Sequence, residues 1–147
     1  MIKDHLRDYA TAAFRNYARC GFPTYEELRK IIFDAALESS RREINRMSRI
    51  PNPTQQAVIN AESAVDERQG ELLDILAVEN ALKIMKDECK KAVEQVYFVD
   101  AQNDFECGDI KERVTRASIE IPASERQIYY WLRTARYVFA VERGLRV

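Results

Sequence analysis

Apolar residues along this chain recur three and four positions apart, which is the spacing of an amphipathic helix. The first such segment runs from about Ile2 to Cys20, where Leu6, Ala13 and Phe14 fall on one face. The same spacing recurs in six later segments, at residues 24–50, 54–65, 71–85, 89–99, 109–118 and 125–143. No stretch alternates apolar and polar residues with the period of two that indicates a strand. The pattern therefore predicts an all-α fold.

Helix-capping and helix-breaking residues mark where these segments begin and end. Thr24 and Glu27 form a capping-box pattern before the second helix, and Thr54 is the expected N-cap of the third. Gly70 is compatible either with a break or with an uninterrupted helix, because a glycine inside a helix costs only about 1 kcal/mol. We place the domain boundary there. It separates an N-terminal helical region of unknown role, residues 1–70, from a helical domain, residues 71–147.

The segment 71–85 has too many apolar residues for a solvated surface helix. They are Leu72, Leu73, Ile75, Leu76, Val78, Ala81, Leu82, Ile84 and Met85. A helix that is apolar over most of its surface is buried in a core or in an oligomer interface. The sequence leaves both open, so a homodimer is one of the expected arrangements.

The last forty residues, 108–147, predict a short helix, a connection and a long helix. Asp109 is the expected cap of the short helix, which should end near residue 118. Pro122 disfavours helical geometry at Ile121, so residues 119–123 are expected to form a rather long connection.

The long helix carries clear signals at both ends. Ser124 and Gln127 form a second capping-box pattern, and Gly144 marks the end of a helix that covers residues 125–143. A short helix, a turn and a capped long helix follow one another in the order of a helix-turn-helix.

The two faces of this last helix differ in chemistry at 100° per residue. The apolar face consists of Ile128, Leu132, Ala135 and Phe139, with Trp131 and Val138 at its flank. The opposite face has hydrogen-bond donors and no carboxylate: Arg126, Tyr130, Arg133 and Tyr137, with Gln127 and Thr134 beside them. In a major groove, Arg bonds guanine in two places, Gln bonds adenine likewise, and Tyr reaches phosphate oxygens. The pattern indicates a helix that reads double-stranded DNA.

These positions define a predicted set of DNA-contacting residues. On and before the long helix they are Ser124, Arg126, Gln127, Tyr130, Arg133 and Tyr137. Further contacts to phosphates are expected from Arg113, Arg116 and Arg136. Because each neutralised phosphate releases counterions, we expect the affinity for DNA to fall steeply with salt.

The overall charge conceals an uneven distribution. The chain has 147 residues and a net charge of −1. Residues 1–50 carry ten basic and seven acidic side chains, residues 51–107 five and twelve, and residues 108–147 eight and five. A modest positive excess at both ends flanks an acidic middle, so the net charge is no argument against a polyanionic partner.

Several classes of function lack the residues they need. His5 is the only histidine, and Cys20, Cys89 and Cys107 have no metal-binding or disulfide spacing. The four glycines are isolated, so no phosphate-binding loop occurs, and acidic residues 62–79 have no histidine companion. We therefore expect no enzyme activity, no cofactor and no metal site. The charged N-terminus and the lack of a membrane-spanning apolar run predict a cytoplasmic protein with no membrane partner.

The C-terminal part also resembles a known family. The residues that carry the resemblance are Ala92–Phe98, Gly108–Ile110, Ile121–Leu132, Ala135–Ala140 and Gly144–Leu145. Over roughly the last 60 residues they resemble phage-encoded ArpU/RinA-type transcriptional regulators, whose helix-turn-helix is similar to that of region 4 in bacterial sigma factors. The resemblance implies a regulator of late genes in a prophage or another mobile element. The stretch from Val114 to Ser124 is longer than the tight turn of the sigma-factor module.

Two alternatives remain open at this point. The tyrosine-rich outer face and the segment 71–85 also suit a helical protein-interaction module, with RNA polymerase or a second copy of the chain as its partner. A DNA-packaging subunit with a similar motif would bind DNA as well. The sequence does not decide between activation and repression, nor does it name a target DNA sequence.

Overall fold

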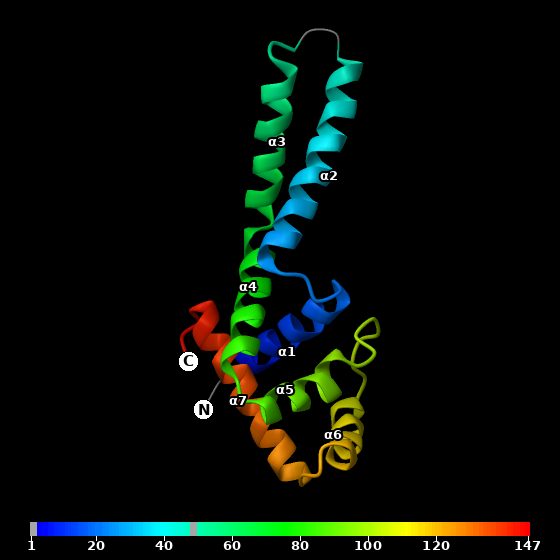
Figure 1. Ribbon diagram of the computed structural model, residues 1–147, viewed down its shortest axis with the longest axis vertical. Coiled ribbons are helices and arrows are strands. Elements are labelled where there is room, and N and C mark those ends of the chain that lie inside the picture. Colours follow the sequence, from blue (N-terminus) through cyan, green and yellow to red (C-terminus); the bar gives the residue numbers. More distant parts are fainter. Residues whose placement is uncertain (1–2, 48–49) are drawn as a thin grey trace. The chain divides into compact units, whose positions relative to one another are not determined.

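The computed structural model describes residues 3–47 and 50–147 (Figure 1). Within this part of the chain the fold is all-α, as predicted, with no strand. The helices are α1 (Asp4–Arg19), α2 (Tyr25–Arg46), α3 (Pro53–Glu67), α4 (Gln69–Ile84), α5 (Asp87–Val93), the π-helical turn η1 (Glu94–Phe98), α6 (Asp109–Glu120) and α7 (Glu125–Arg143). Ile2, the expected start of the first helix, lies outside the described residues.

The chain forms two compact units. One contains the described residues up to Phe22 together with Ile75–Val147, and the other contains Pro23–Asp74. The second boundary falls near the one expected at residue 70. The helix α1, by contrast, packs with the C-terminal helices rather than with its neighbours in sequence, because its apolar face contacts η1 and α7.

The unit Pro23–Asp74 is built on a hairpin of α2 and α3, drawn in blue-cyan and green in Figure 1. Ala57, Ala61 and Val65 recur every four residues along α3 and are buried. Small residues at this spacing let the backbones of two helices approach closely. One polar contact joins the hairpin, since the Asn60 side-chain amide donates to the Ser40 hydroxyl at 2.7 Å.

The caps of these two helices agree with the sequence in one case and differ in the other. Thr24 accepts from the Glu27 backbone N–H at 3.1 Å while its own N–H donates to the Glu27 carboxylate, as predicted. The expected cap at Thr54 is wrong. Asn52 caps α3 from a left-handed backbone conformation, and its Oδ1 accepts from the Gln55 N–H at 3.3 Å. Pro53 supplies the first helical residue, where a missing N–H costs nothing.

The helix break expected near Gly70 occurs two residues earlier. Arg68 alone separates α3 from α4, with φ −103° and ψ 18°, and Gly70 lies inside α4. In the rest of α4 and just after it, Ile75, Val78 and Met85 are buried within the chain. The apolar segment 71–85 therefore contributes to the intramolecular core.

Aromatic side chains from three helices form the centre of the larger unit. Phe14 of α1 stacks on Tyr97 of η1, with ring centroids 5.7 Å apart, and also contacts Phe139 of α7 at 5.7 Å. All three side chains are buried. Val114 of α6 and Leu132 of α7 are buried as well, so α6 and α7 are both held by apolar packing.

The connection between α6 and α7 is short, and the prediction of a long one at residues 119–123 is wrong. Ile119 and Glu120 are helical, which leaves four residues, 121–124, between the two helices. The restriction that Pro122 imposes reaches back only to Ile121, whose extended backbone (φ −102°, ψ 111°) ends α6.

Candidate nucleic-acid interface

The helix α7 has the two faces that its sequence predicts. Its bounds, Glu125–Arg143, agree with the prediction, and Gly144 ends it in a left-handed conformation at φ 79°. Ile128, Leu132, Ala135 and Phe139 are all buried. Trp131 and Val138, at the flank of this face, are half-buried. Packing on one side fixes which residues of α7 point outward.

Two polar contacts set the start of α7. The Ser124 hydroxyl accepts from the Gln127 N–H at 3.2 Å, so Ser124 is the N-cap. The Thr115 hydroxyl of α6 donates to the Glu125 carboxylate at 2.8 Å. This second contact ties α6 to the first turn of α7, so the two helices are linked directly across the four-residue turn.

The outward face of α7 is exposed and has no carboxylate. Arg126, Gln127 and Arg133 are exposed, Tyr130 is 61% exposed and Tyr137 is 50% exposed. Neither Arg126 nor Arg133 has an ion-pair partner among the described residues. We call these five residues the outer face of α7. It combines two unpaired guanidinium groups, one amide and two phenols on one side of a rigid helix.

The three other predicted contact residues lie in different surroundings. Arg116 on α6 is exposed and within 3.4 Å of Glu112, an ion pair one helical turn away. Arg113 donates to the carbonyls of Val96 and Val99, and its guanidinium lies over a phenylalanine ring. Arg113 therefore holds the segment after η1 in place.

Arg136 also contacts another helix rather than solvent alone. Its Nη1 donates to the Tyr97 hydroxyl at 2.7 Å, and the side chain is half-buried. The structure thus brings Ser124 and the outer face of α7 together, leaves Arg116 on α6, and engages Arg113 and Arg136 in contacts within the fold.

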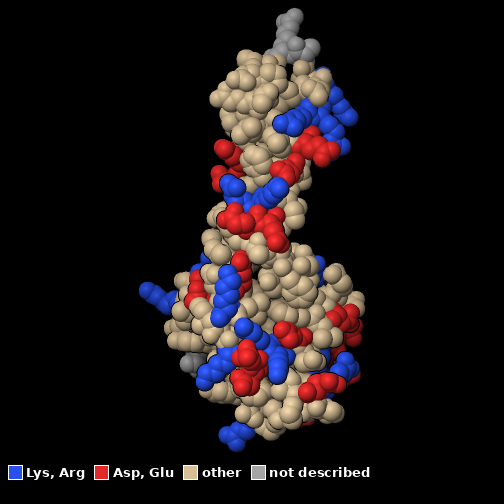
Figure 2. All heavy atoms as spheres, in the orientation of Figure 1, with Lys and Arg blue, Asp and Glu red and all other residues tan. Residues whose placement is uncertain are grey.

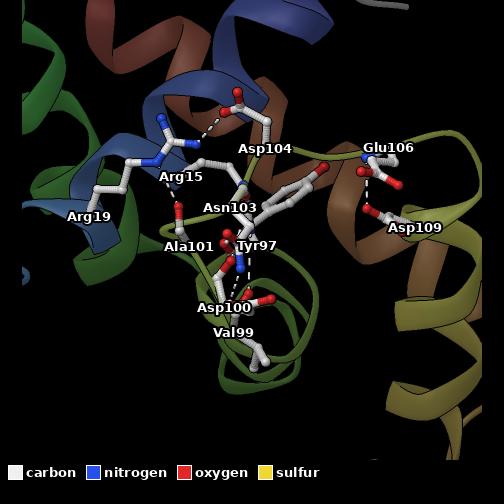
Figure 3. Close-up of polar contacts among 10 residues, drawn as sticks. All are labelled: Arg15, Arg19, Tyr97, Val99, Asp100, Ala101, Asn103, Asp104, Glu106 and Asp109. Carbon is white, nitrogen blue, oxygen red and sulfur yellow. Dashed lines mark hydrogen bonds and ion pairs between the residues drawn. The ribbon is translucent and has the colours of Figure 1, made fainter.

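Sequence reasoning missed a buried arginine that organises the loop after η1 (Figure 3). Arg15 is 4% exposed and donates to the carbonyls of Tyr97 at 3.1 Å, Val99 at 3.4 Å and Asp100 at 3.3 Å, and to that of Asn103. Its guanidinium lies 3.9 Å from the centroid of Phe105.

The surroundings of Arg15 are costly for a charge. Burial lowers the pKa of Arg15 below its usual value, and the nearby cations Arg113 and Arg19 lower it further, against the opposing effect of Asp100 and Asp104. Arg19 shares in the same loop, with Nε donating to the Ala101 carbonyl at 2.6 Å and an ion pair to Asp104 at 2.7 Å (Figure 3). These contacts lock residues 97–105 against α1.

Charges of both signs are interspersed on the face of the molecule shown in Figure 2. No extended patch of one sign covers this face, so any recognition of a polyanion must depend on a local arrangement such as the outer face of α7. Among the described residues, no three potential metal ligands come together, and no helix is long and apolar enough to cross a bilayer.

Comparison of the chain with family profiles, with curated proteins and with solved structures gave no match in any of the three.

Proposed function

We propose that this chain is a sequence-specific DNA-binding protein that regulates transcription, with α7 as its recognition helix. The observation that carries the proposal is the outer face of α7, where Arg126, Tyr130, Arg133 and Tyr137 are exposed with no carboxylate among them. A solvated surface helix usually mixes both signs of charge, whereas a face for DNA needs donors alone.

The arrangement of α6 and α7 supports the same reading. A major groove is about 12 Å wide and admits one helix, while a preceding helix braces it and crosses the backbone. Here α6 packs on α7, and the Thr115–Glu125 hydrogen bond joins them across a turn of four residues. With 19 residues, α7 is about 28 Å long, enough to lie along several base pairs.

Each residue of the outer face has a role that its chemistry suits. Arg126 and Arg133 would bond guanine O6 and N7, and Gln127 would bond adenine. Tyr130 and Tyr137 would donate to phosphate oxygens. At the N-terminus of α7, Ser124 and the first backbone N–H groups would approach a phosphate, since a helix N-terminus favours an anion.

Arg116 completes the proposed contact set, since it is exposed on α6. Arg113 and Arg136 are used within the fold, so we leave them out. The resemblance to ArpU/RinA-type regulators extends the proposal to genes of a prophage or mobile element, in the bacterial cytoplasm.

The test is selection of bound sequences from random duplex DNA, followed by fluorescence anisotropy with the selected site. Combined replacement of Arg126 and Arg133 by Ala should weaken binding roughly 100-fold or more, because each good base contact contributes about 1–3 kcal/mol. The matched control is Arg29→Ala with Lys30→Ala, two exposed residues of α2 that remove the same charge.

Equal losses in the two double variants would mean that only net charge matters, and recovery of no preferred sequence would contradict specific recognition. Circular dichroism confirms that each variant is folded.

A second candidate, a helical protein-interaction module, is favoured by the half to mostly exposed phenols of Tyr130 and Tyr137. Tyrosine is common at protein interfaces because it buries a large area at little cost in conformational entropy. RNA polymerase, a second copy of this chain or a DNA-packaging assembly would then be the partner. Self-association by light scattering, with no retention on any duplex DNA, would favour this candidate.

A further inference from the structure

A cavity of about 600 Å³ lies in the larger unit, away from the outer face of α7. Thr11, Ala12 and Arg15 line it from α1, and Tyr129, Leu132 and Arg136 line it from α7. Phe105 and Ile110 close another side. This volume falls within the range of about 300–1,000 Å³ that is typical of small-molecule sites, which are mostly apolar with a few polar groups.

The charged groups at the cavity do not balance. Four arginines line it, Arg7, Arg15, Arg19 and Arg136, against two carboxylates, Asp8 and Asp104. Both carboxylates already pair, Asp8 with Arg7 at 3.6 Å and Asp104 with Arg19 at 2.7 Å. Arg15 and Arg136 have no carboxylate at ion-pair distance among the described residues.

These two guanidinium groups contact only neutral partners. The printed hydrogen bonds of Arg15 go to backbone carbonyls, which satisfy N–H groups but carry no net charge. Arg136 donates from Nη1 to the Tyr97 hydroxyl, and its buried Nε has no acceptor among the described residues. A charge removed from water is costly unless it is paired, so this wall of the cavity favours an anion.

We propose that the cavity binds a small organic anion, a carboxylate or a phosphate monoester attached to a planar apolar body. Arg136 binds the anionic group, with Arg7 at the edge of the cavity contributing a second cation. Tyr129, Leu132 and Ile110 offer apolar surface to the body of the ligand. A planar guanidinium binds carboxylate and phosphate in two places, which makes arginine the suited residue here.

The site is independent of the proposed DNA contacts, although both involve α7. Tyr129 and Arg136 line the cavity, whereas Arg126 and Arg133 belong to the outer face. A ligand in the cavity is therefore detectable with no DNA present, and each claim can fail without the other.

The experiment is isothermal titration of the full chain with phenyl phosphate and benzoate, with phenol and benzamide as neutral counterparts. The anions should bind and the neutral compounds should not. Arg136→Met should weaken binding about tenfold or more, since a hydrogen bond to a charged group contributes that much. Ala12→Trp should abolish binding by filling the cavity from an exposed position of α1 without any change of charge.

Arg133→Met is the matched control, because it removes one arginine of α7 outside the cavity. It should bind phenyl phosphate as the wild type does, whatever its effect on DNA. Absence of anion binding by the wild type, or unchanged binding by Ala12→Trp, would overturn the proposal. Inorganic phosphate that binds as tightly as phenyl phosphate would overturn the contribution of the apolar wall. If Arg136→Met does not fold, Ala12→Trp decides.

Discussion

The guanidinium of Arg15 lies on the ring of Phe105, with its Cζ 3.9 Å from the ring centroid. On the other side of the argument from charge, the same guanidinium bonds four backbone carbonyls between Tyr97 and Asn103. One side chain of α1 thereby fixes a loop more than eighty residues later, and the loop in turn supports α6.

Replacement of Arg15 should destabilise the larger unit strongly. Arg15→Met removes the donors for buried carbonyls, and we expect a loss of about 2–4 kcal/mol in the free energy of unfolding by urea. Arg15→Lys should recover little of it, because one ammonium group cannot bond four separated carbonyls. Arg7→Ala is the exposed control on the same helix, with an expected change near zero. Wild-type stability in Arg15→Lys would contradict this role.

The caps of α3 make a second test within one turn of helix. Asn52→Ala should cost about 1 kcal/mol, because it removes the acceptor for the Gln55 N–H. Thr54→Ala, two residues on, should change stability by no more than a few tenths of a kcal/mol, since Thr54 is inside the helix. Urea denaturation of both variants decides, and the reverse order would restore Thr54 as the cap.

Two aromatic residues of α7 should differ in their contribution to stability. Phe139 is fully buried, so Phe139→Ala should cost about 3–5 kcal/mol. Trp131 is only half-buried, so Trp131→Ala should cost less, about 1–3 kcal/mol. Thermal and urea unfolding measure both. A larger loss at Trp131 than at Phe139 would mean that the packing face of α7 is rotated from the one described.

The three cysteines should separate by reactivity. Cys20 and Cys107 are exposed and Cys89 is buried. Burial, and secondarily the neighbouring Glu88, raises the pKa of Cys89, so its thiol stays protonated to higher pH than an ordinary cysteine. With Ellman's reagent at pH 8, two thiols should react rapidly and the third only after urea is added. Rapid reaction of all three in the native chain would contradict the packing of α5.

The salt dependence of DNA binding should distinguish two residues of the outer face of α7. Arg126→Ala should reduce the slope of log affinity against log salt by about 1 if Arg126 neutralises a phosphate, because one fewer counterion is released. Gln127→Ala removes no charge, so it should change sequence preference and leave the slope as it is. Anisotropy titrations over a series of salt concentrations measure both slopes. An altered slope in Gln127→Ala would argue against this division of roles.

The sequence by itself determined the helices and the faces of α7, because both depend on local order. Apolar spacing places Ile128, Leu132 and Phe139 on one side whatever lies opposite them, and Ser124 and Gly144 act on their own neighbours. The outer face of α7 could therefore be predicted residue by residue.

Only the tertiary structure decided the place of Arg15 and of the other arginines inside the fold. At 100° per residue, Arg15 is about 180° from the buried Leu6, on the side of α1 that periodicity assigns to solvent. It is buried because the loop at residues 97–105 covers it, and no pattern within α1 contains that information. The same holds for Arg113 and Arg136, since an arginine bonds a carbonyl or a hydroxyl only where distant backbone brings one within reach.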